Sequence, residues 1–255
     1  MSTRRIWALV TVLIASLVAG CGGDDGDGSS SASTGTTTSA SAPSATPPPT
    51  PDLSPLSAAE LSKRSRVALD EARTFHVSLS AAQKGESFAL DVSYGTTGSH
   101  GTMTVNGAKV DILTIDKAFY MRAPDTIWRK QFGAEADQAL AILSGKWLKL
   151  TTTDKEFAEY SEFGTRDGFV RSMLADWVTN PRKAGQKTIS GIQCLGLAGS
   201  DGTLWINKVD ARPVQLETRR SASIRGRMTF SDYNTVTEPK APPKSTTIDI
   251  TKLRG

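Results

Sequence analysis

The sequence predicts an α+β fold, with one antiparallel sheet and helices gathered on a single face. Three observations predict it. Apolar residues alternate with polar ones over short segments in both halves of the chain. Amphipathic helical patterns lie between these two sets of segments. Turn signals such as Asn106-Gly107 separate neighbouring strands. Strands, a helical insert and further strands are typical of a single sheet that is covered on one side.

The first twenty residues have the pattern of a lipoprotein signal peptide. Arg4 and Arg5 precede the apolar run 6–18, which is shorter than the roughly 20 residues that a bilayer-spanning helix needs. The run ends in Val18-Ala19-Gly20-Cys21, which is typical of a bacterial lipobox, where the cysteine thiol is diacylated. Two acyl chains give stable anchoring. We therefore expect Cys21 to be lipidated and to hold the protein at the extracytoplasmic face of the cell membrane; an ordinary secretory cleavage site is the alternative.

The sequence divides into residues 1–20 as the signal peptide, 21–56 as the lipidated cysteine with its tether, and 57–255 as one folded domain. Within 22–55, every residue except Leu53 is Gly, Asp, Ser, Ala, Thr or Pro. Such a composition offers too little apolar surface to offset the entropy of ordering. We expect a flexible tether with a span of about 30 Å, whose removal costs the domain almost no stability.

The domain is expected to begin with a helix over residues 57–73. Ser57 and Glu60 have the spacing of a capping box, and Leu56 with Leu61 can form a hydrophobic staple. From Phe75 onward the apolar period becomes two. This period predicts a five-stranded antiparallel meander with one apolar face, over residues 75–81, 88–94, 103–105, 110–114 and 119–121.

The rest of the chain alternates between the two periods. Residues 125–143 and 165–178 have helical spacing. Strands are expected at 146–150, 188–197, 203–207, 213–219 and 227–233. Residues 238–243 are rich in proline and should be extended or looped.

Residues 202–233 carry a recurring pattern. It reads Gly-Thr-Leu-Trp-Ile-Asn at 202–207, Arg-Pro-Val-Gln-Leu-Glu at 212–217 and Gly-Arg-Met-Thr-Phe-Ser-Asp-Tyr at 226–233. With the Pro-rich tail that follows, it resembles the mycobacterial LppX/LprG-type lipoproteins and, more distantly, the LolA/LolB lipoprotein carriers. The resemblance covers most of residues 57–250, although Asn207 stands where Asp is more usual. It implies a curved antiparallel half-barrel sheet, a LolA-like fold with helices covering the concave face, and an apolar cavity that binds acyl chains.

The implied cavity needs apolar and aromatic side chains from both the sheet and the helices. The candidates for its lining are Phe88, Leu90, Val92, Met103, Val110, Ile112, Met121, Trp128, Phe132, Leu140, Phe169, Met173 and Trp177. An ordinary packed core would use the same residues. Two functions therefore remain open: a carrier of lipid or glycolipid, and a non-enzymatic sensor or structural lipoprotein of the cell envelope with the same fold and no lipid ligand.

Few residues in the sequence are suited to catalysis or to metal binding. The chain has two histidines and two cysteines, which leaves little material for a metal site, and we expect no metal and no cofactor. His76 should lie on the solvent face of a strand, and Cys194 should be buried and inert. No Gly-x-Ser-x-Gly motif occurs, so we expect no enzymatic activity. The folded part has 28 basic and 22 acidic side chains without basic blocks, so the expected partners are lipid and membrane, not nucleic acid. We expect a monomer.

Overall fold

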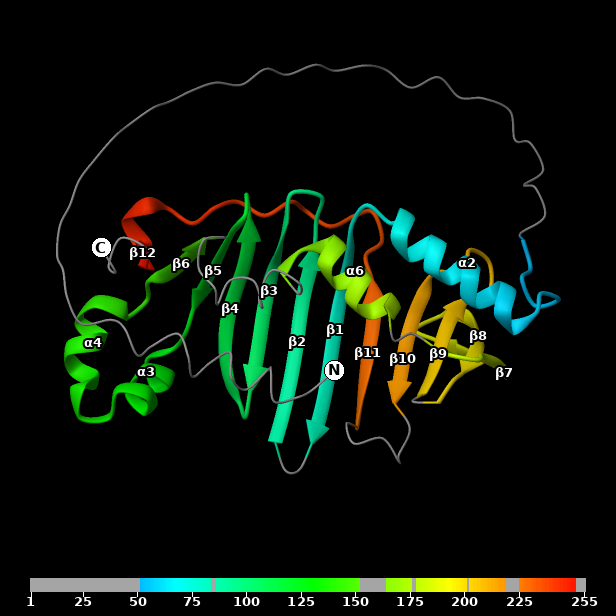
Figure 1. The fold of residues 1–255 in the computed structure, drawn as a ribbon, viewed down its shortest axis with the longest axis horizontal. Coiled ribbons are helices and arrows are strands. Elements are labelled where there is room, and N and C mark those ends of the chain that lie inside the picture. The colour runs from blue at the N-terminus through cyan, green and yellow to red at the C-terminus, as the bar shows by residue number, and fades with distance from the viewer. Residues whose placement is uncertain are drawn as a thin grey trace, which may run out of the picture.

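A computed structural model describes residues 51–83, 86–151, 164–175, 178–200, 202–218 and 225–250. Its centre is a twelve-stranded sheet in the order β12-β6-β5-β4-β3-β2-β1-β11-β10-β9-β8-β7, which does not close (Figure 1). The strands are β1 (Phe75–Gln83), β2 (Glu86–Tyr94), β3 (Gly98–Val105), β4 (Ala108–Ile115), β5 (Ala118–Arg122), β6 (Trp147–Thr151), β7 (Arg182–Ile189), β8 (Ile192–Ala198), β9 (Gly202–Asn207), β10 (Pro213–Thr218), β11 (Arg225–Ser231) and β12 (Thr247–Asp249). The α-helices are α2 (Ala58–Glu71), α3 (Asp125–Phe132), α4 (Ala136–Leu143) and α6 (Arg166–Ala175).

The strand order follows the chain in both halves of the sheet. The strands β1 to β6 pair antiparallel in sequence, which confirms the predicted meander and adds β6 to it. The other half runs from β7 to β11, and β11 pairs antiparallel with β1, so that the two halves form one sheet. Only β12 is parallel to its neighbour, β6, among the pairs of the described strands.

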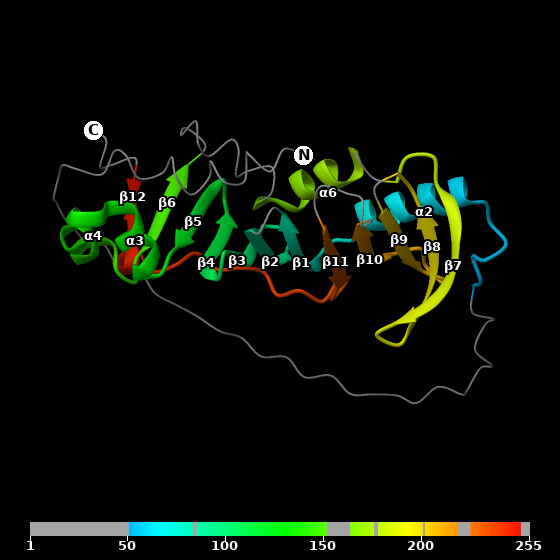
Figure 2. The ribbon, with the colours of Figure 1, turned by 90° about the horizontal axis from the view of Figure 1, so that it is seen from below.

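The sheet is strongly curved, and α2 and α6 lie on its concave side (Figure 2). Close approaches between strands require glycine at several positions, among them Gly101 and Gly202. A Cβ atom at Gly101 would lie 2.0 Å from the carbonyl oxygen of Asp91, and one at Gly202 would lie 2.1 Å from that of Glu217. No other residue fits so near a neighbouring backbone. The α+β fold with a curved half-barrel sheet and helices on its concave face is confirmed.

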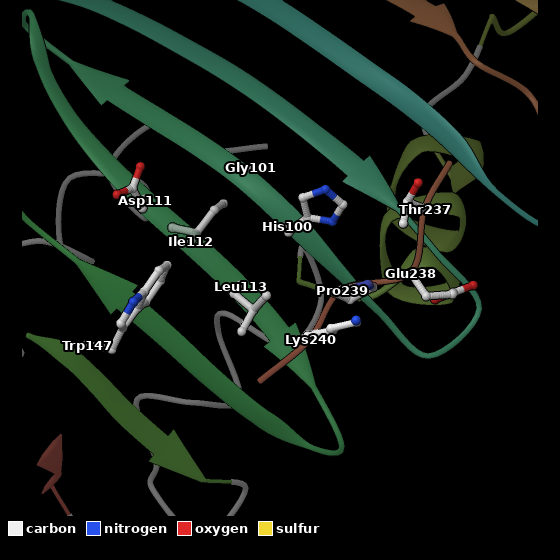
Figure 3. A pocket seen from close by; sticks show the side chains of 10 residues that line it. All are labelled: His100, Gly101, Asp111, Ile112, Leu113, Trp147, Thr237, Glu238, Pro239 and Lys240. Carbon is white, nitrogen blue, oxygen red and sulfur yellow. The ribbon is translucent and has the colours of Figure 1, made fainter. Parts of the chain in front are cut away.

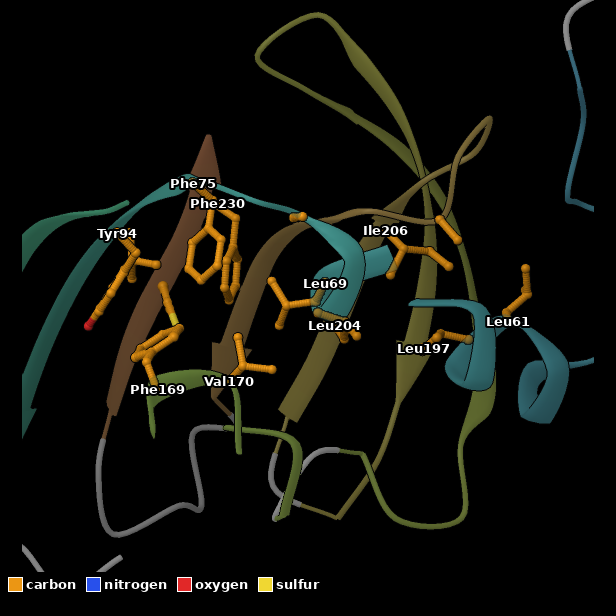
Figure 4. Packing of buried hydrophobic residues seen from close by; sticks show 14 of the residues in the cluster. Leu61, Leu69, Phe75, Tyr94, Phe169, Val170, Leu197, Leu204, Ile206 and Phe230 are labelled. Atoms are coloured by element: carbon orange, nitrogen blue, oxygen red, sulfur yellow. The ribbon is translucent and has the colours of Figure 1, made fainter. Parts of the chain in front are cut away.

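Two hydrophobic clusters form the core on the concave side. In the first cluster, α2 and α6 pack on β1, β2 and β8 to β11 (Figure 4); its members include Leu61, Leu69, Phe75, Val92, Tyr94, Phe169, Val170, Leu197, Leu204, Ile206 and Phe230. In the second cluster, α3 and α4 pack on β4, β5 and β6; it consists of Val110, Phe119, Met121, Ala123, Trp128, Leu140, Leu143, Leu148, Leu150 and Ile250. The helices therefore cover two separate parts of the sheet.

The first helix forms where its capping signal predicts it. The side-chain oxygen of Ser57 accepts a hydrogen bond of 3.2 Å from the backbone N–H of Glu60. Leu56, the candidate staple residue, packs against the first cluster. Capping of this kind satisfies backbone donors that the first turn of a helix leaves free.

Two elements differ from the sequence prediction. The helix predicted over residues 125–143 is broken into α3 and α4, because Gly133 adopts a left-handed φ of 55° and ends α3. The strand predicted over residues 188–197 is a hairpin of β7 and β8, whose turn residues Ser190 and Gly191 have φ angles of 47° and 83°. Positive φ at both central residues is the geometry of a tight hairpin turn.

The segments that precede α2 and follow β11 both pack against the domain. Leu53, grouped with the tether by its sequence, is buried in the first cluster, and its backbone N–H donates to the carbonyl oxygen of Lys208 over 3.0 Å. At the other end, residues 232–243, which we call the strap, run without helix or strand across the convex face between β11 and the β12 end (Figure 2). The predicted irregular conformation of 238–243 is confirmed.

Candidate functional site

Six of the predicted lining residues are buried inside the two clusters. Val92 and Phe169 belong to the first cluster and are 1% and 2% exposed. The other four, Val110, Met121, Trp128 and Leu140, belong to the second. These side chains are already in contact with other apolar groups, so a ligand could reach most of them only by displacing a neighbour.

Five other predicted lining residues are partly buried. Phe88, Leu90, Met103 and Ile112 lie on the concave face of β2 to β4, and Phe132 lies on α3. Leu90 is the cross-strand partner of both Met103 and the partly buried Leu79 of β1. We call Leu79, Phe88, Leu90, Met103 and Ile112 the central strip. It spans four neighbouring strands between the two clusters.

The helices border the strip on both sides. On one side, the ring of Phe169 on α6 stacks on Tyr94 with 4.7 Å between the centroids and lies 5.9 Å from Phe75. Burial raises the pKa of Tyr94 far above its usual 10.0. On the other side, Ile112 packs against both clusters, so that the strip adjoins the second cluster, to which Trp128 of α3 belongs.

Buried polar groups mark one end of the strip. The hydroxyl of Ser99 donates to the carbonyl oxygen of Gly164 over 2.6 Å. Its cross-strand neighbour Thr114 is 3% exposed, and its hydroxyl oxygen has no hydrogen-bond partner. The unpaired hydroxyl of Thr114 could form a hydrogen bond with a polar group at this end of the strip.

Three predicted site residues lie wholly or partly outside the described residues. The side chain of Met173 and the whole of Trp177 belong to this group, and so does the predicted acylation site Cys21. Their roles remain predictions. Among the helices of the described ranges, none combines the length and apolar character that a bilayer span requires.

A hollow of about 400 Å³ lies on the opposite, convex face (Figure 3). It is lined by His100, Gly101, Asp111, Ile112, Leu113, Trp147 and residues 237–240 of the strap. The strap is held there by Glu238, whose carboxylate accepts four hydrogen bonds of 2.7 to 3.1 Å from Thr96 and Thr97. The sequence showed no sign of this hollow, since the strap and β3 are far apart along the chain.

A second hollow of about 560 Å³ adjoins the first through Asp111. It lies where β5 leads into α3. The guanidinium of Arg122 donates to Asp111 over 2.7 and 2.9 Å and lies over the ring of Trp147 at 4.8 Å. Lys109 and Asp125 also line it, so basic and acidic side chains are balanced and no strong preference for an anion results.

His76 lies on the convex face, as its strand position predicts, among residue types that occur in hydrolase triads. Its Nε2 is 3.1 Å from Asp91 and its Nδ1 is 3.2 Å from the hydroxyl of Ser231. That hydroxyl donates to Asp232 over 2.9 Å. A nucleophile requires its proton to be directed at the base and a concave site for the substrate. These residues line neither of the two hollows, and the arrangement gives no support for acyl transfer.

The single thiol among the described residues is buried, as predicted. Cys194 is 0% exposed, and its sulfur contacts the carbonyl oxygen of Ile192 at 3.3 Å. Burial raises the pKa of the thiol above its usual 9.0, which disfavours the reactive thiolate. Within the described ranges, no three His, Cys, Asp or Glu residues lie close enough to hold a metal ion.

No protein-family model and no curated protein matches the sequence. Solved structures with a similar fold include LprF from Mycobacterium bovis, at a TM-score of 0.48 and 16% identity over 72% of this chain and 96% of that one. Lipoprotein LppX from Mycobacterium tuberculosis follows at 0.45 and 15%, over 71% and 97%. A LolA superfamily protein from Nitrosomonas europaea gives 0.27 and 12%, over 72% and 96%. Mycobacterial lipoproteins and a LolA superfamily protein are thus among the structures that this chain resembles in fold.

Proposed function

We propose that this protein is a lipoprotein of the cell envelope that binds the acyl chains of a lipid or glycolipid on the concave face of its sheet and carries them within the envelope. The observation that supports binding is the central strip, a continuous row of partly buried apolar side chains between two helix-covered clusters. Contiguous exposed apolar surface is typical of interaction sites. The proposal includes no catalytic step.

The energetics favour an acyl chain as the occupant. Each CH₂ group removed from water contributes about 0.8 kcal/mol, so a long chain along the strip retains several kcal/mol after the entropic cost of binding. The buried polar groups at Ser99 and Thr114 offer a place for a headgroup linkage at one end of the strip.

The test compares two tryptophan substitutions on neighbouring residues of β3. Met103 belongs to the central strip, whereas Thr104 pairs with Ala89 and Lys109 on the convex face. The chain from residue 22 on keeps every described residue and lacks the proposed acylation site. We expect Met103→Trp to weaken the binding of a fluorescent long-chain acyl probe about tenfold or more, which corresponds to about 1.4 kcal/mol. Thr104→Trp is the matched control and should bind like the wild type.

The alternative is a lipoprotein of the same fold without a lipid ligand. The burial of six predicted lining residues within packed clusters favours it. Under this alternative the wild type binds no probe. Equal binding by wild type, Met103→Trp and Thr104→Trp would place the ligand elsewhere on the molecule and contradict the proposed site.

The proposed membrane anchor is Cys21, which follows the apolar run 6–18 in a lipobox pattern. We expect Cys21→Ser either to release the protein from the membrane fraction or to leave it unprocessed, because the thiol that accepts the diacylglycerol is absent. Fractionation of host cells with immunodetection measures this. Normal processing and full membrane retention of Cys21→Ser would contradict the anchor.

A further inference from the structure

The two hollows on the convex face adjoin each other, and the proposed lipid binding uses neither of them. They measure about 400 and 560 Å³, are open to solvent, and share Asp111 on β4. Both volumes lie within the range of about 300–1,000 Å³ that is common for small-molecule sites. The central strip lies on the other side of the sheet, so the hollows form a separate candidate site.

Apolar side chains border the first hollow, the one of about 400 Å³. Leu113 is 7% exposed and packs with the partly buried indole of Trp147 on β6. In Figure 3, Leu113 lies between Trp147 and the strap residues Pro239 and Lys240, and all four line the hollow. The side chains of Leu113, Trp147 and Pro239 can contact the C–H groups of a ligand and carry no charge.

Arg122 holds two side chains in place at the border between the hollows. It is the cross-strand partner of Asp111, and its Nε and Nη2 both donate to Oδ2 of that residue, over 2.9 and 2.7 Å. The same guanidinium lies over the ring of Trp147, 4.8 Å from its centroid. Oδ1 of Asp111 accepts no hydrogen bond from a described residue. A ligand hydroxyl can donate to this oxygen at a low entropic cost, because the carboxylate is already oriented.

Two donors lie on the strap side of the first hollow. Lys240 is exposed, and its ammonium group has no hydrogen bond or ion pair with a described residue. The ring of His100 also lines the hollow, and its Nδ1 is buried without a hydrogen-bond partner. A buried acceptor without a partner is tolerated better than a buried N–H. In the neutral ring the proton therefore belongs on Nε2, which is then the donor available to a ligand.

The formal charges around the first hollow cancel, which argues against an ionic ligand. Asp111 is paired with Arg122, and the carboxylate of Glu238 is balanced by Lys240 on the same strap. An anionic ligand would meet both carboxylates. An acyl chain would take the polar groups out of water without giving them partners. A peptide that binds by strand addition needs a free sheet edge, whereas the first hollow lies on the face of the sheet.

We propose that the two hollows bind a neutral oligosaccharide, with one sugar ring against Trp147 and Leu113 and with its hydroxyl groups on Asp111 and Lys240. A pyranose ring combines apolar C–H groups with hydroxyl groups that both donate and accept hydrogen bonds, so it suits an apolar wall, an acceptor and two donors at once. The shared border at Asp111 gives a second sugar unit access to the neighbouring hollow. This activity goes beyond the proposed lipid binding and does not depend on it.

The first experiment screens the chain from residue 22 on against an array of neutral linear trisaccharides and their counterparts with one uronic acid. We expect binding to neutral members and about fivefold weaker binding to the acidic counterpart of the same linkage, because Asp111 and Glu238 repel its carboxylate. Titration calorimetry with the tightest neutral trisaccharide then gives the reference dissociation constant. Binding to no neutral trisaccharide, or tighter binding to its acidic counterpart, would overturn the proposal.

Two matched pairs of variants locate the site. Asp111→Ala and Lys240→Ala remove groups that line the first hollow, whereas Asp91→Ala and Lys244→Ala remove exposed charges that line neither hollow. We expect Asp111→Ala to weaken the trisaccharide about tenfold and Lys240→Ala about two- to fivefold, with no change in either control. Charges at the surface contribute little to stability, so the thermal midpoints should stay close to that of the wild type. An equal loss of affinity in a hollow variant and its control would overturn the site.

The sugar has two candidate sources: a polysaccharide, or the headgroup of a glycolipid in a membrane. Vesicles that carry the same trisaccharide on a diacylglycerol distinguish them. Sedimentation of the protein with these vesicles, reversed by the free trisaccharide, would indicate a headgroup. Binding of the free trisaccharide without sedimentation would indicate a polysaccharide. Both results support the proposed site, since the chemistry that it recognises is the same.

The indole resonances provide a test in the wild type. The Nε1–H signal of Trp147, assigned with Trp147→Phe, should shift when the neutral trisaccharide is added. That of Trp205, which donates to Glu217 over 3.1 Å outside both hollows, should stay in place. Acyl-probe binding should be the same with and without the sugar. A signal of Trp147 that does not move, or displacement of the acyl probe by the trisaccharide, would overturn the proposal. A wild type that binds the trisaccharide but no acyl probe would contradict the proposed function alone.

Discussion

Glu238 holds the strap to the sheet with a single side chain. Its two carboxylate oxygens accept hydrogen bonds from the hydroxyl and backbone N–H groups of Thr96 and Thr97. These hydrogen bonds lower the pKa of Glu238 from 4.5 to about 2, and those from Thr96 have the largest effect. A carboxyl whose pKa is lower in the folded state stabilises it above the unfolded pKa, and this stabilisation disappears as the pH falls from about 5 towards 2.

We expect Glu238→Ala to lower the free energy of unfolding at pH 7 by about 1–3 kcal/mol, because it removes hydrogen bonds to a charged acceptor. The difference between the two proteins should shrink as the pH falls below 5, since the wild type then loses the contribution that the variant lacks. Urea unfolding at pH 7 and pH 3 measures both effects. Glutamine keeps one acceptor oxygen but carries no charge. The free energy of unfolding of Glu238→Gln at pH 7 should therefore lie between those of the wild type and Glu238→Ala. A difference that is the same at both pH values would refute the role of the ionised carboxylate.

Two neighbouring apolar positions on β4 should respond differently to added bulk. Val110 is 2% exposed within the second cluster, whereas Ile112 in the central strip is only partly buried. Val110→Trp should destabilise the protein by about 1–3 kcal/mol through overpacking, with or without lipid. Ile112→Phe should leave the thermal midpoint nearly unchanged and weaken acyl-probe binding. If Ile112→Phe lowered the thermal midpoint as much as Val110→Trp or more, the strip would be as tightly packed as the clusters.

Among the structural elements, the segment before α2 has a larger role than its composition suggests. The sequence places it in the tether, yet Leu53 is buried in the first cluster and Asp52 forms an ion pair of 3.1 Å with Lys208. The Nζ of Lys183 donates to the carbonyl oxygen of Ser54 over 2.7 Å. These contacts lead us to expect that residues 51–56 stabilise the domain, whereas their sequence indicates that they could be removed without cost.

This expectation is tested by comparing chains that begin at residues 22, 51 and 57. The first two should have the same thermal midpoint, because residues 22–50 consist only of Gly, Asp, Ser, Ala, Thr and Pro and offer too little apolar surface to pack on the domain. The third should unfold at a lower temperature, since full burial of one leucine contributes about 1.5–3 kcal/mol. Leu53→Ala in the longest chain provides a matched control and should lose about 2 kcal/mol. Identical midpoints for all three chains would show that the segment does not stabilise the domain.

The break between α3 and α4 is a second feature at the level of the structural elements. Periodicity alone joins residues 125–143 into one helix, because Trp128, Leu140 and Leu143 all fit a helical stripe. The left-handed conformation of Gly133 turns the chain back, and α4 then packs beside α3 over the same cluster. Glycine tolerates this conformation at little cost, which is why the break occurs at this residue.

For the whole molecule, the open sheet leaves two edges that could pair with a second copy. The edge strand β7 carries Arg182, Lys183 and Lys187, and its register shifts between Lys183 and Gln186, around the left-handed Gly185. The other edge, β12, has three residues. Charged side chains, an irregular register and a short strand are the means by which natural sheets avoid pairing at their edges.

We therefore expect the chain from residue 22 on to be a monomer. Size-exclusion chromatography with light scattering should give the mass of one chain across a wide range of protein concentrations. A mass that rises towards two chains with concentration would contradict this, and would show that one of the sheet edges or another surface is an interface.

The sequence by itself determined the start of α2, the meander of β1 to β5, the irregular conformation of residues 238–243 and the burial of Cys194. Caps, alternation and turns depend on residues close together in the chain, so local patterns predict them. The positions of His76 and of the apolar face follow from the same period of two. The signal peptide and Cys21 are also sequence patterns, and they remain predictions.

Only the tertiary structure decided which predicted lining residues are packed and which form the central strip. Val110 and Ile112 are apolar residues on the same face of β4. They differ in burial because α3 and α4 cover Val110 more fully than Ile112. The hydrogen bond from Thr96 to Glu238 joins residues that are 142 positions apart in the chain. Contacts of this kind depend on how distant segments pack, and no local pattern in the sequence encodes them.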